Sequence, residues 1–279
     1  MFPQNEAIGE GNVNHELQFF RHKRRRYAEK ALPLQKGFLN RSLQNMKKMT
    51  VLSTLLDFLF PRHCAVCGKR LEWDEDVMCL LCNAALPRTE YWTTPYDNPV
   101  AQLFWGKIPI EKAIAYYHFK SQTGDAQIIY DIKYHNRQDM ARQMGEMMAR
   151  EVGESGFFDD IDCIIPVPLS LKRRMERGYN QCEVLAKGMG KVTGLPVLPY
   201  VVIRKRFDGS QTHLTRWERE KNVEDVFELK DAEEIRGKHV LLVDDVITTG
   251  ATTLSCATQL LKAEGSRISI LSIGYAGKR

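Results

Sequence analysis

The stretch Val240-Leu241-Leu242-Val243-Asp244-Asp245-Val246-Ile247-Thr248-Thr249-Gly250-Ala251-Thr252 decides the fold of this chain. Its apolar beginning, with His239 before it, is typical of a buried strand, and two carboxylates follow where we expect that strand to end. A turn rich in Thr and Gly comes next, and from Thr252 onward apolar residues recur at helical spacing. The sequence therefore predicts a strand, a turn and a helix, with the turn at the N-terminus of the helix.

This turn has the chemistry of a phosphate site. Free backbone N–H groups and the positive end of the helix dipole attract an anion at a helix N-terminus. Gly250 lets the backbone approach an oxyanion closely, and the hydroxyls of Thr248, Thr249 and Thr252 add donors. We therefore expect these four residues to hold a monophosphate.

The two acids have a different predicted role, because Asp244 and Asp245 would repel a phosphate that they faced. Carboxylates accept hydrogen bonds from hydroxyls and bind Mg²⁺, so the pair is expected to hold the two hydroxyls of a ribose or a magnesium ion. The alternative is an ordinary strand, turn and helix with solvated acids and capping threonines. A Walker loop is disfavoured, because the Gly-Lys-[Ser/Thr] ending is absent.

The stretch resembles the 5-phosphoribosyl pyrophosphate (PRPP) motif of type I phosphoribosyltransferases. In that motif two acidic residues contact the ribose hydroxyls and the following loop holds the 5′-phosphate. The resemblance implies that Asp244 and Asp245 are the ribose acids. It implies that the phosphate loop consists of Thr248, Thr249, Gly250 and Thr252.

A second pattern consists of two cysteine pairs, Cys64-x-x-Cys67 and Cys79-x-x-Cys82. Each pair can occupy a tight turn that directs two thiolates at one point, and four sulfur ligands form a closed tetrahedral shell for Zn²⁺. Because no coordination position is left for water, we expect a structural zinc ion in a small ribbon. The alternatives are four unligated thiols or two disulfides.

Length and composition indicate one main domain with a small attached module. The chain has 279 residues, of which 43% are hydrophobic, so it can bury a sizeable core. No segment has the length and apolarity of a membrane span, and no export signal is recognisable. We therefore expect a cytoplasmic protein without membrane insertion, whose cysteines are reduced or bound to metal.

The positive charge of the chain is concentrated before Met49. That segment has ten Lys and Arg against four Glu, a net charge of +6, while the whole chain has +5. It lacks apolar periodicity, so residues 1–48 are predicted to be a disordered basic arm. Such an arm could contact a polyanion, or it could be an inert tail that arises from a start codon upstream of Met46 or Met49.

Beyond the cysteines, apolar strands alternate with amphipathic helices. This alternation favours a mostly parallel α/β sheet with its ligand at the carboxyl ends of the strands. We expect a ribbon module over 49–90, a connector over 91–108 and a phosphoribosyltransferase-like domain over 109–279. The predicted strands are 112–119, 162–167, 197–204, 239–243 and 267–273, and the predicted helices are 125–135, 138–152 and 181–192.

Two basic segments accompany these elements. Residues 169–181 form an expected basic loop that leads into a helix, and residues 210–223 lie just upstream of the strand that carries the acids. Their cations suit a second anion such as pyrophosphate, although any one of them could be solvated surface charge. The candidate anion contacts are Lys133, Arg173, Arg177 and Arg219.

Together these features are similar to those of the ComF family, which joins an N-terminal zinc ribbon to a phosphoribosyltransferase-like domain. The resemblance runs from about residue 49 to the end of the chain and leaves the arm outside. The family is linked to natural transformation, the uptake of single-stranded DNA. The motifs that carry the resemblance lie at 56–61, 132–134, 166–168, 177–181, 211–223 and 240–252.

The resemblance implies a protein that binds PRPP or a nucleotide-like molecule. If it is catalytic, pyrophosphate leaves C1 of PRPP as a base or amine attacks, and Mg²⁺ neutralises the leaving group. No residue identifies the acceptor or a catalytic group. A complete amidophosphoribosyltransferase is not expected, because no cysteine precedes Cys64 to act as an N-terminal glutaminase nucleophile.

The alternative hypothesis is a non-catalytic adaptor for single-stranded DNA and the competence machinery, with a regulatory phosphosugar site. Aromatic side chains beside basic grooves can stack bases, although each is more often part of a core. The candidates for stacking are Tyr91, Trp92, Trp105 and Trp217.

Overall fold

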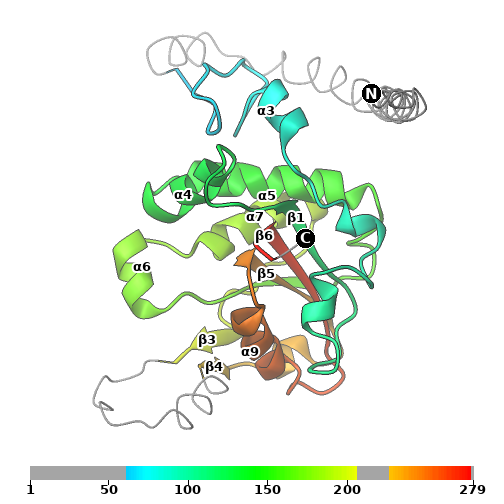
Figure 1. The fold of residues 1–279 in the computed structure, drawn as a ribbon. Helices are drawn as coiled ribbons and strands as arrows, with labels where there is room; N and C mark the ends of the chain where they lie inside the picture. The colour runs from blue at the N-terminus through cyan, green and yellow to red at the C-terminus, as the bar shows by residue number, and fades with distance from the viewer. Residues whose placement is uncertain (1–60, 206–225, 278–279) are drawn as a thin grey trace, which may run out of the picture. The chain divides into compact units, whose positions relative to one another are not determined.

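The computed structural model describes residues 61–205 and 226–277 (Figure 1). The basic arm at 1–48, the beginning of the expected ribbon module and the loop that contains Arg219 and Trp217 lie outside the described residues. The chain divides into two units, residues 1–62 and 63–279, and the second contains almost all of the described structure.

The centre of the second unit is a four-stranded parallel sheet with the strand order β1-β6-β5-β2. Since every strand runs in the same direction, their carboxyl ends meet at one edge. The two central strands are the longest, and nearly every residue in them is buried, as expected for a sheet covered on both faces. The strands are β1 (Ala113–His118), β2 (Cys163–Pro166), β5 (His239–Ile247) and β6 (Arg267–Tyr275).

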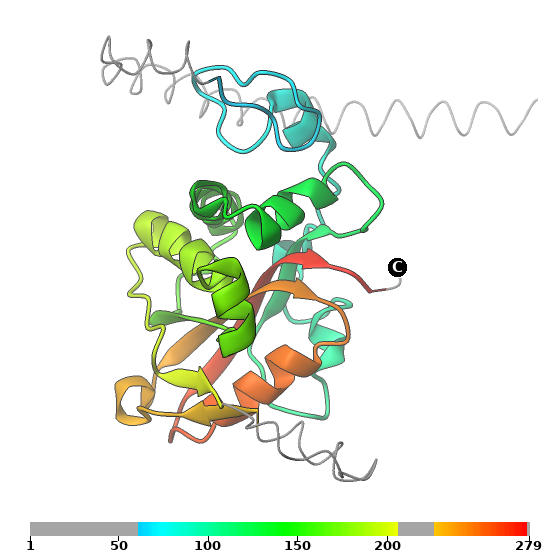
Figure 2. The ribbon, with the colours of Figure 1, turned by 90° about the vertical axis from the view of Figure 1, so that its left-hand side faces the viewer.

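Helices cover both faces of this sheet (Figures 1 and 2). Side chains alternate along each strand, so Leu241 and Val243 join the core under one helical layer, while Val240 and Leu242 join the core on the other face. The first layer contains α4 (Ala126–Tyr134), α5 (Gln138–Gly153) and α7 (Gln181–Thr193). The other face carries α9 (Ala251–Leu260) and a small antiparallel pair, β3 (Val202–Arg204) with β4 (Phe227–Leu229). These elements confirm the predicted fold class.

Two glycines allow α5 and α7 to cross in close contact. A Cβ added to Gly145 would lie 2.1 Å from the carbonyl oxygen of Leu185, and one added to Gly188 would lie 2.1 Å from the carbonyl oxygen of Arg142. Each glycine therefore receives the backbone of the other helix directly. This contact fixes where α7 begins relative to the sheet.

Most predicted elements are confirmed, and three predictions need correction. The strand expected over 197–204 is shorter and pairs with β4 instead of joining the main sheet; Val197 forms only an isolated bridge to Ile164. The expected basic loop after β2 contains a helix, α6 (Leu171–Arg177). Ser170 caps the start of α6 by accepting from the Arg173 N–H at 3.3 Å, and Gly178 ends it at φ 78°.

The third correction concerns the acid-bearing strand, which does not end before Asp244. β5 continues to Ile247 because β6 continues to Tyr275, and the two strands stay paired through Ile247 and Tyr275. The acids therefore lie within the last part of a strand, close to the edge where all the strands end.

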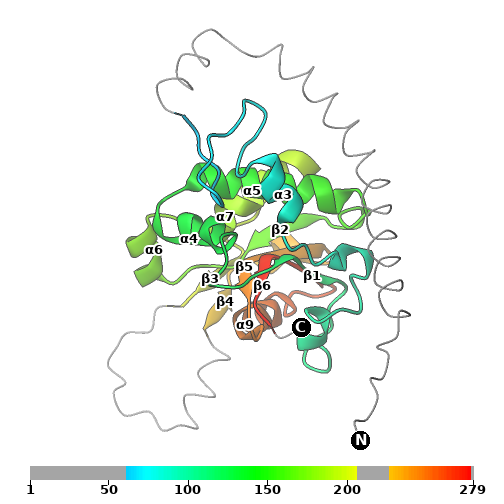
Figure 3. The same cartoon turned by 45° about the horizontal axis from the view of Figure 1, so that its top comes forward.

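The cysteine module, residues 63–86, packs on the helical layer through a few apolar side chains. Leu71, Val77, Met78 and Leu86 belong to the same core as Met144. The only regular element of the module is the helix α3 (Leu80–Ala85), labelled in Figure 3. Between the module and β1 lie two short 3₁₀ turns, η1 (Tyr91–Thr93) and η2 (Ala101–Leu103); a third, η3 (Glu233–Ile235), precedes β5.

Arg88 links the module to the domain. Its guanidinium donates to the carboxylate of Glu151 on α5, to the side chain of Asn83 at 2.7 Å and to the hydroxyl of Tyr116 at 3.1 Å. Burial of Arg88 opposes its charged form, but Tyr116 and Glu151 raise its pKa overall. The bidentate pair of Arg88 with Glu151, together with the contact to Tyr116 on β1, fixes the end of the module against α5 and the sheet.

Among residues 61–205 and 226–277, no helix has the length and apolarity that crossing a membrane requires.

Candidate functional site

The acid pair lies at the carboxyl-terminal part of β5, between the start of α7 and the start of α9. Asp244 is 7% exposed and Asp245 is 8% exposed, so both are almost enclosed. Two adjacent buried carboxylates are costly unless neighbouring groups donate to them or neutralise them. The donors to each carboxylate therefore show how the site is built.

Asp244 is held by its own strand and by α9. Its Oδ1 accepts from the Asp245 N–H at 2.8 Å, and its Oδ2 accepts from the Thr253 hydroxyl at 2.9 Å. The thiol of Cys182 lies 3.8 Å from Oδ1. Burial, and then the charge of Asp245, raise the pKa of Asp244 to about 6. The chain thus tolerates a charge on Asp244 at neutral pH but does not favour it.

Asp245 is contacted by two helices, α4 and α7, which lie on the face of the sheet opposite α9. The ammonium of Lys133, at the end of α4, lies 3.1 Å from Oδ1, and the Gln181 amide, at the start of α7, donates to Oδ2 at 2.6 Å. The Val246 N–H donates to Oδ1 at 2.6 Å. Asp245 therefore has a cation on one side and an amide on the other.

The predicted phosphate loop has the exposed donors that such a site needs. Thr248, Thr249 and Thr252 are all exposed, and α9 begins at Ala251, directly after the turn. Gly250 is buried with φ +75°, and a Cβ there would lie 3.3 Å from the ring of Phe104. Glycine is therefore required at this position both for the left-handed backbone and for the close contact.

The four candidate anion contacts have different surroundings. Lys133 is in the site, but its charge is paired with Asp245. Arg173 is exposed on α6, and Arg177 lies 5.4 Å from the centroid of the Tyr134 ring. Burial, and then the charge of Arg173, lower the pKa of Arg204 on β3, so the positive charge of α6 acts on the separate β3–β4 pair. Arg219 lies outside the described residues.

Two residues of the site were not predicted. Gln181 stands in the Arg177-Gly178-Tyr179-Asn180-Gln181 motif, which carries the family resemblance, but nothing in that motif announces a contact 64 residues along the chain. Thr253 follows the phosphate loop and resembles any helical threonine in sequence, yet it is 1% exposed and donates to Asp244. Both contacts depend on how separate elements pack.

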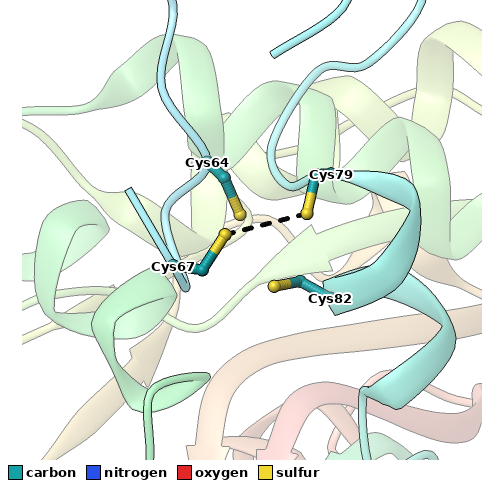
Figure 4. Close-up of side chains that lie close together, drawn as sticks. All are labelled: Cys64, Cys67, Cys79 and Cys82. Carbon is teal, nitrogen blue, oxygen red and sulfur yellow. Dashed lines mark hydrogen bonds between the residues drawn. The ribbon is translucent and has the colours of Figure 1, made fainter. Parts of the chain in front are cut away.

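The four predicted zinc cysteines come together in the cysteine module (Figure 4). Their sulfur atoms all lie within 4.8 Å of one another, and the sulfurs of Cys67 and Cys79 are 3.8 Å apart. Four sulfurs around one Zn²⁺ with bonds of about 2.3 Å would be about 3.8 Å apart. The donor set and its spacing therefore fit a metal ion with four sulfur ligands.

The electrostatics of the cluster favour a thiolate. Burial alone would raise the pKa of Cys64, but the backbone N–H groups of Cys79, Cys67 and Val66 outweigh it and lower the pKa to about 7. Burial and the other three thiols raise the pKa of Cys82. The lowered pKa of Cys64 favours the thiolate form that binds a metal ion.

Comparisons with known proteins agree with this architecture. Residues 177–276 match the model of the phosphoribosyl transferase domain. The chain is 27% identical over 146 residues to "DNA utilization protein YhgH" of Salmonella typhimurium, across 51% of this chain and 63% of that protein. It is 34% identical over 116 residues to "Competence protein F" of Haemophilus influenzae, across 41% of this chain and 51% of that protein.

The domain match and the names of these relatives support a ComF-family protein. As the alignments cover less than two thirds of these two ComF-like relatives, they support the family and not a specific activity. Among solved structures, the PRPP amidotransferase of Bacillus subtilis is 22% identical to this chain, with a TM-score of 0.36. The match covers 50% of this chain and 30% of the amidotransferase chain. That score is low, so the fold of this chain rests on the domain match and the sheet topology.

Proposed function

We propose that this protein binds PRPP or a closely related 5-phosphosugar at the carboxyl edge of its sheet, and that it does so within DNA uptake in the cytoplasm. One observation supports this most: the enclosed acid pair stands directly beside a helix N-terminus with three exposed threonine hydroxyls. Acceptors for sugar hydroxyls and donors for a phosphate thus lie at the two ends of one turn.

In this proposal, different residues contact different parts of the ligand. The N–H groups of the turn and the hydroxyls of Thr248, Thr249 and Thr252 hold the 5′-phosphate. The carboxylates of Asp244 and Asp245 accept from the ribose hydroxyls, since a carboxylate pair has about eight lone-pair positions and only some of these are used within the chain. The ring is thereby fixed with C1 directed away from the loop.

The same arrangement supports one reaction, pentosyl transfer. In it the bond from C1 to pyrophosphate breaks, a bond from C1 to a nitrogen of the acceptor forms, and that nitrogen loses a proton. Mg²⁺ bound to the pyrophosphate of PRPP would neutralise the leaving group. The group Cys182, Asp244 and Asp245 is a poor site for Mg²⁺, because it includes a thiol and Lys133 pairs with one of the acids. The ion therefore belongs with the ligand.

For the cysteine module we propose one structural Zn²⁺ held by Cys64, Cys67, Cys79 and Cys82. Four sulfur ligands leave no open position, so the ion supplies folding energy and no catalysis. The sulfur spacing described above supports this assignment.

Calorimetric titration of the full chain with PRPP and Mg²⁺ tests the proposal. Asp244→Asn combined with Asp245→Asn should abolish binding without loss of the fold, because the amides no longer provide two charged acceptors. The matched control is Glu233→Gln with Glu234→Gln, two exposed neighbouring acids on η3 at the other end of β5. An Asn double variant that binds PRPP with wild-type affinity would contradict the proposal.

A second candidate, a single-stranded-DNA adaptor, is favoured by α6. No residue of this helix is buried, and it carries the exposed cations Lys172, Arg173 and Arg174. Its Arg177 lies over the ring of Tyr134, which is 66% exposed. Of the aromatic residues proposed to stack bases, Trp92 instead stacks on Tyr116, while Trp105 is exposed. Exposed cations and aromatics together bind single strands.

Binding of a short labelled single strand across a salt series separates the two candidates. The adaptor predicts affinity that falls steeply with salt, and a weaker salt dependence in Lys172→Gln with Arg174→Gln. Release of pyrophosphate from PRPP with a panel of bases, in the absence of affinity for DNA, would instead favour the enzyme.

A further inference from the structure

Segments that are distant in the chain converge on Asp245. Lys133 comes from the end of α4 and Gln181 from the start of α7, and the two contact different oxygens of the same carboxylate at 3.1 and 2.6 Å. Neither contact is local, and neither is needed to form the helix that provides it. The two residues therefore serve the acid pair rather than their own elements.

The start of α7 is fixed in place by contacts of the residues just before Gln181. The Tyr179 hydroxyl donates to the carbonyl of Ile132, next to Lys133 on α4. The Asn180 amide donates to the Val167 carbonyl at 3.2 Å, just after β2, and its Oδ1 accepts from the Cys182 N–H at 3.1 Å. The amide of Gln181 is thus attached to a rigid frame, as a residue that selects a ligand requires.

The nitrogen of the Gln181 amide has a hydrogen-bond partner among the described residues, and its oxygen has none. Gln181 is 4% exposed, and its Nε2 donates to Asp245. Among the described residues, its Oε1 is buried and accepts no hydrogen bond. The opposite orientation of the amide would place two acceptor oxygens 2.6 Å apart, so Asp245 determines which atom is left over.

A buried carbonyl oxygen without a donor is unfavourable, and an apolar side chain of the same length would avoid that loss. No described residue supplies that donor, and a ligand bound beside Asp245 could supply it. A donor that reaches Oε1 also lies beside the two carboxylates, which accept hydroxyl groups. The chemistry that satisfies all three acceptors is that of a polyhydroxyl group.

We propose that Gln181 is a specificity-determining residue that accepts a hydrogen bond from a hydroxyl of the bound sugar. With Asp244 and Asp245 it forms a set of three acceptors that selects a phosphosugar with a vicinal diol, such as ribose 5-phosphate, over its 2-deoxy analogue. This inference rests on the proposed function, because it assigns a further residue to the same site.

The test compares three probes by calorimetry with the full chain: ribose 5-phosphate, 2-deoxyribose 5-phosphate and inorganic phosphate. Gln181→Met keeps the length of the side chain and removes the amide. The matched control is Gln127→Met, because Gln127 also donates to a carboxylate at 2.6 Å, that of Asp131, but on the exposed side of α4.

Wild type should prefer ribose 5-phosphate to its 2-deoxy analogue. Gln181→Met should reduce this preference about fivefold, the equivalent of one neutral hydrogen bond, and leave the affinity for inorganic phosphate unchanged. Gln127→Met should match wild type with all three probes. A purely structural role for Gln181 would instead weaken phosphate binding and leave the preference between the sugars unchanged.

The outcomes distinguish failure of the role of Gln181 from failure of the proposed function. If wild type binds the sugars and Gln181→Met keeps the wild-type preference, or loses phosphate affinity without losing preference, the role of Gln181 is wrong and the proposed function stands. If wild type binds no phosphosugar, the proposed function fails and the role of Gln181 fails with it.

A measurement on isotope-labelled wild type avoids dependence on the variant. The side-chain amide resonances of Gln181 should shift when ribose 5-phosphate is added and stay in place when inorganic phosphate is added. Equal responses to both probes would overturn the role of Gln181.

Discussion

The cysteine module and the parallel sheet obtain their stability in different ways. The only regular helix of the module, α3, buries none of its six residues, and a few side chains, among them Leu71, Met78 and Leu86, join the module to the core under the helical layer. In contrast, β5 buries every residue except Val246, with a separate core on each face. The module is too small to fold on its own core, so we expect it to depend on the zinc ion proposed for its four sulfurs, while the sheet needs no such support.

The largest expected effect comes from removing the sulfurs. Cys64→Ser with Cys67→Ser should lower zinc content from one equivalent to none and unfold residues 71–86, since a structural zinc ion contributes roughly 10 kcal/mol or more. Hydrogen exchange should accelerate in the module and stay slow in β2 and β5. The control Cys256→Ala removes a buried thiol of the domain and should retain zinc. Equal protection of the module in both variants would show that the module does not depend on these sulfurs.

The next effect is specific to the sheet domain. Gly188→Ala places a Cβ against a backbone oxygen of α5, so the helices must move apart, at a cost above about 3 kcal/mol. Thermal unfolding should show a much lower midpoint, while zinc content stays at one equivalent. Gly153→Ala is the matched control, because its nearest contact would be an ordinary 3.7 Å to the Phe158 ring. Similar melting of both variants would show that the crossing is not tight.

A smaller effect depends on pH. Burial raises the pKa of Asp244 from 3.8 to about 6, so the folded chain binds this proton more tightly than the unfolded chain. The free energy of unfolding therefore falls as pH rises from about 4 to about 6, and the loss remains above that range. Asp244→Asn should raise the melting temperature at pH 8 and lose this advantage towards pH 4, although it weakens ligand binding. A variant that is less stable than wild type at pH 8 would contradict the cost assigned to this charge.

The smallest effect concerns Thr253. Its hydroxyl lowers the pKa of Asp244 by donating to it, against the larger effects of burial and Asp245. Thr253→Val removes one hydrogen bond and should destabilise the fold by about 1 kcal/mol at neutral pH. The pH at which Asp244 titrates, followed by NMR, should rise. Thr258→Val is the control, because Thr258 is exposed on the same helix and donates only to the backbone of Leu254. An unchanged titration in Thr253→Val would remove this residue from the site.

The sequence predicts local patterns well and their mutual placement poorly. The spacing of Cys64, Cys67, Cys79 and Cys82 predicts a cluster, and alternation along the chain predicts most strands and helices. In contrast, Gln181 and Thr253 were not predicted, because their contacts with the acids depend on where α7 and α9 begin against β5. The pairing of β3 with β4 was missed for another reason, since three-residue strands carry too little periodicity.

At the acid pair, too, the sequence predicts the local motif but misses a long-range contact. The motif at 240–252 identifies the acids and the loop, yet it does not show that Lys133 already neutralises Asp245. A candidate pyrophosphate contact thus has a partner within the chain. The long range of this contact, from α4 to β5, explains why periodicity and spacing alone could not reveal it.

The most direct measurement is a crystal structure of the full chain soaked with ribose 5-phosphate. The phosphate should lie within hydrogen-bond distance of the backbone N–H groups and hydroxyls between Thr248 and Thr252, and the sugar hydroxyls should face Asp244 and Asp245. A sugar phosphate bound elsewhere, or one whose phosphate lies away from this turn, would contradict the central claim.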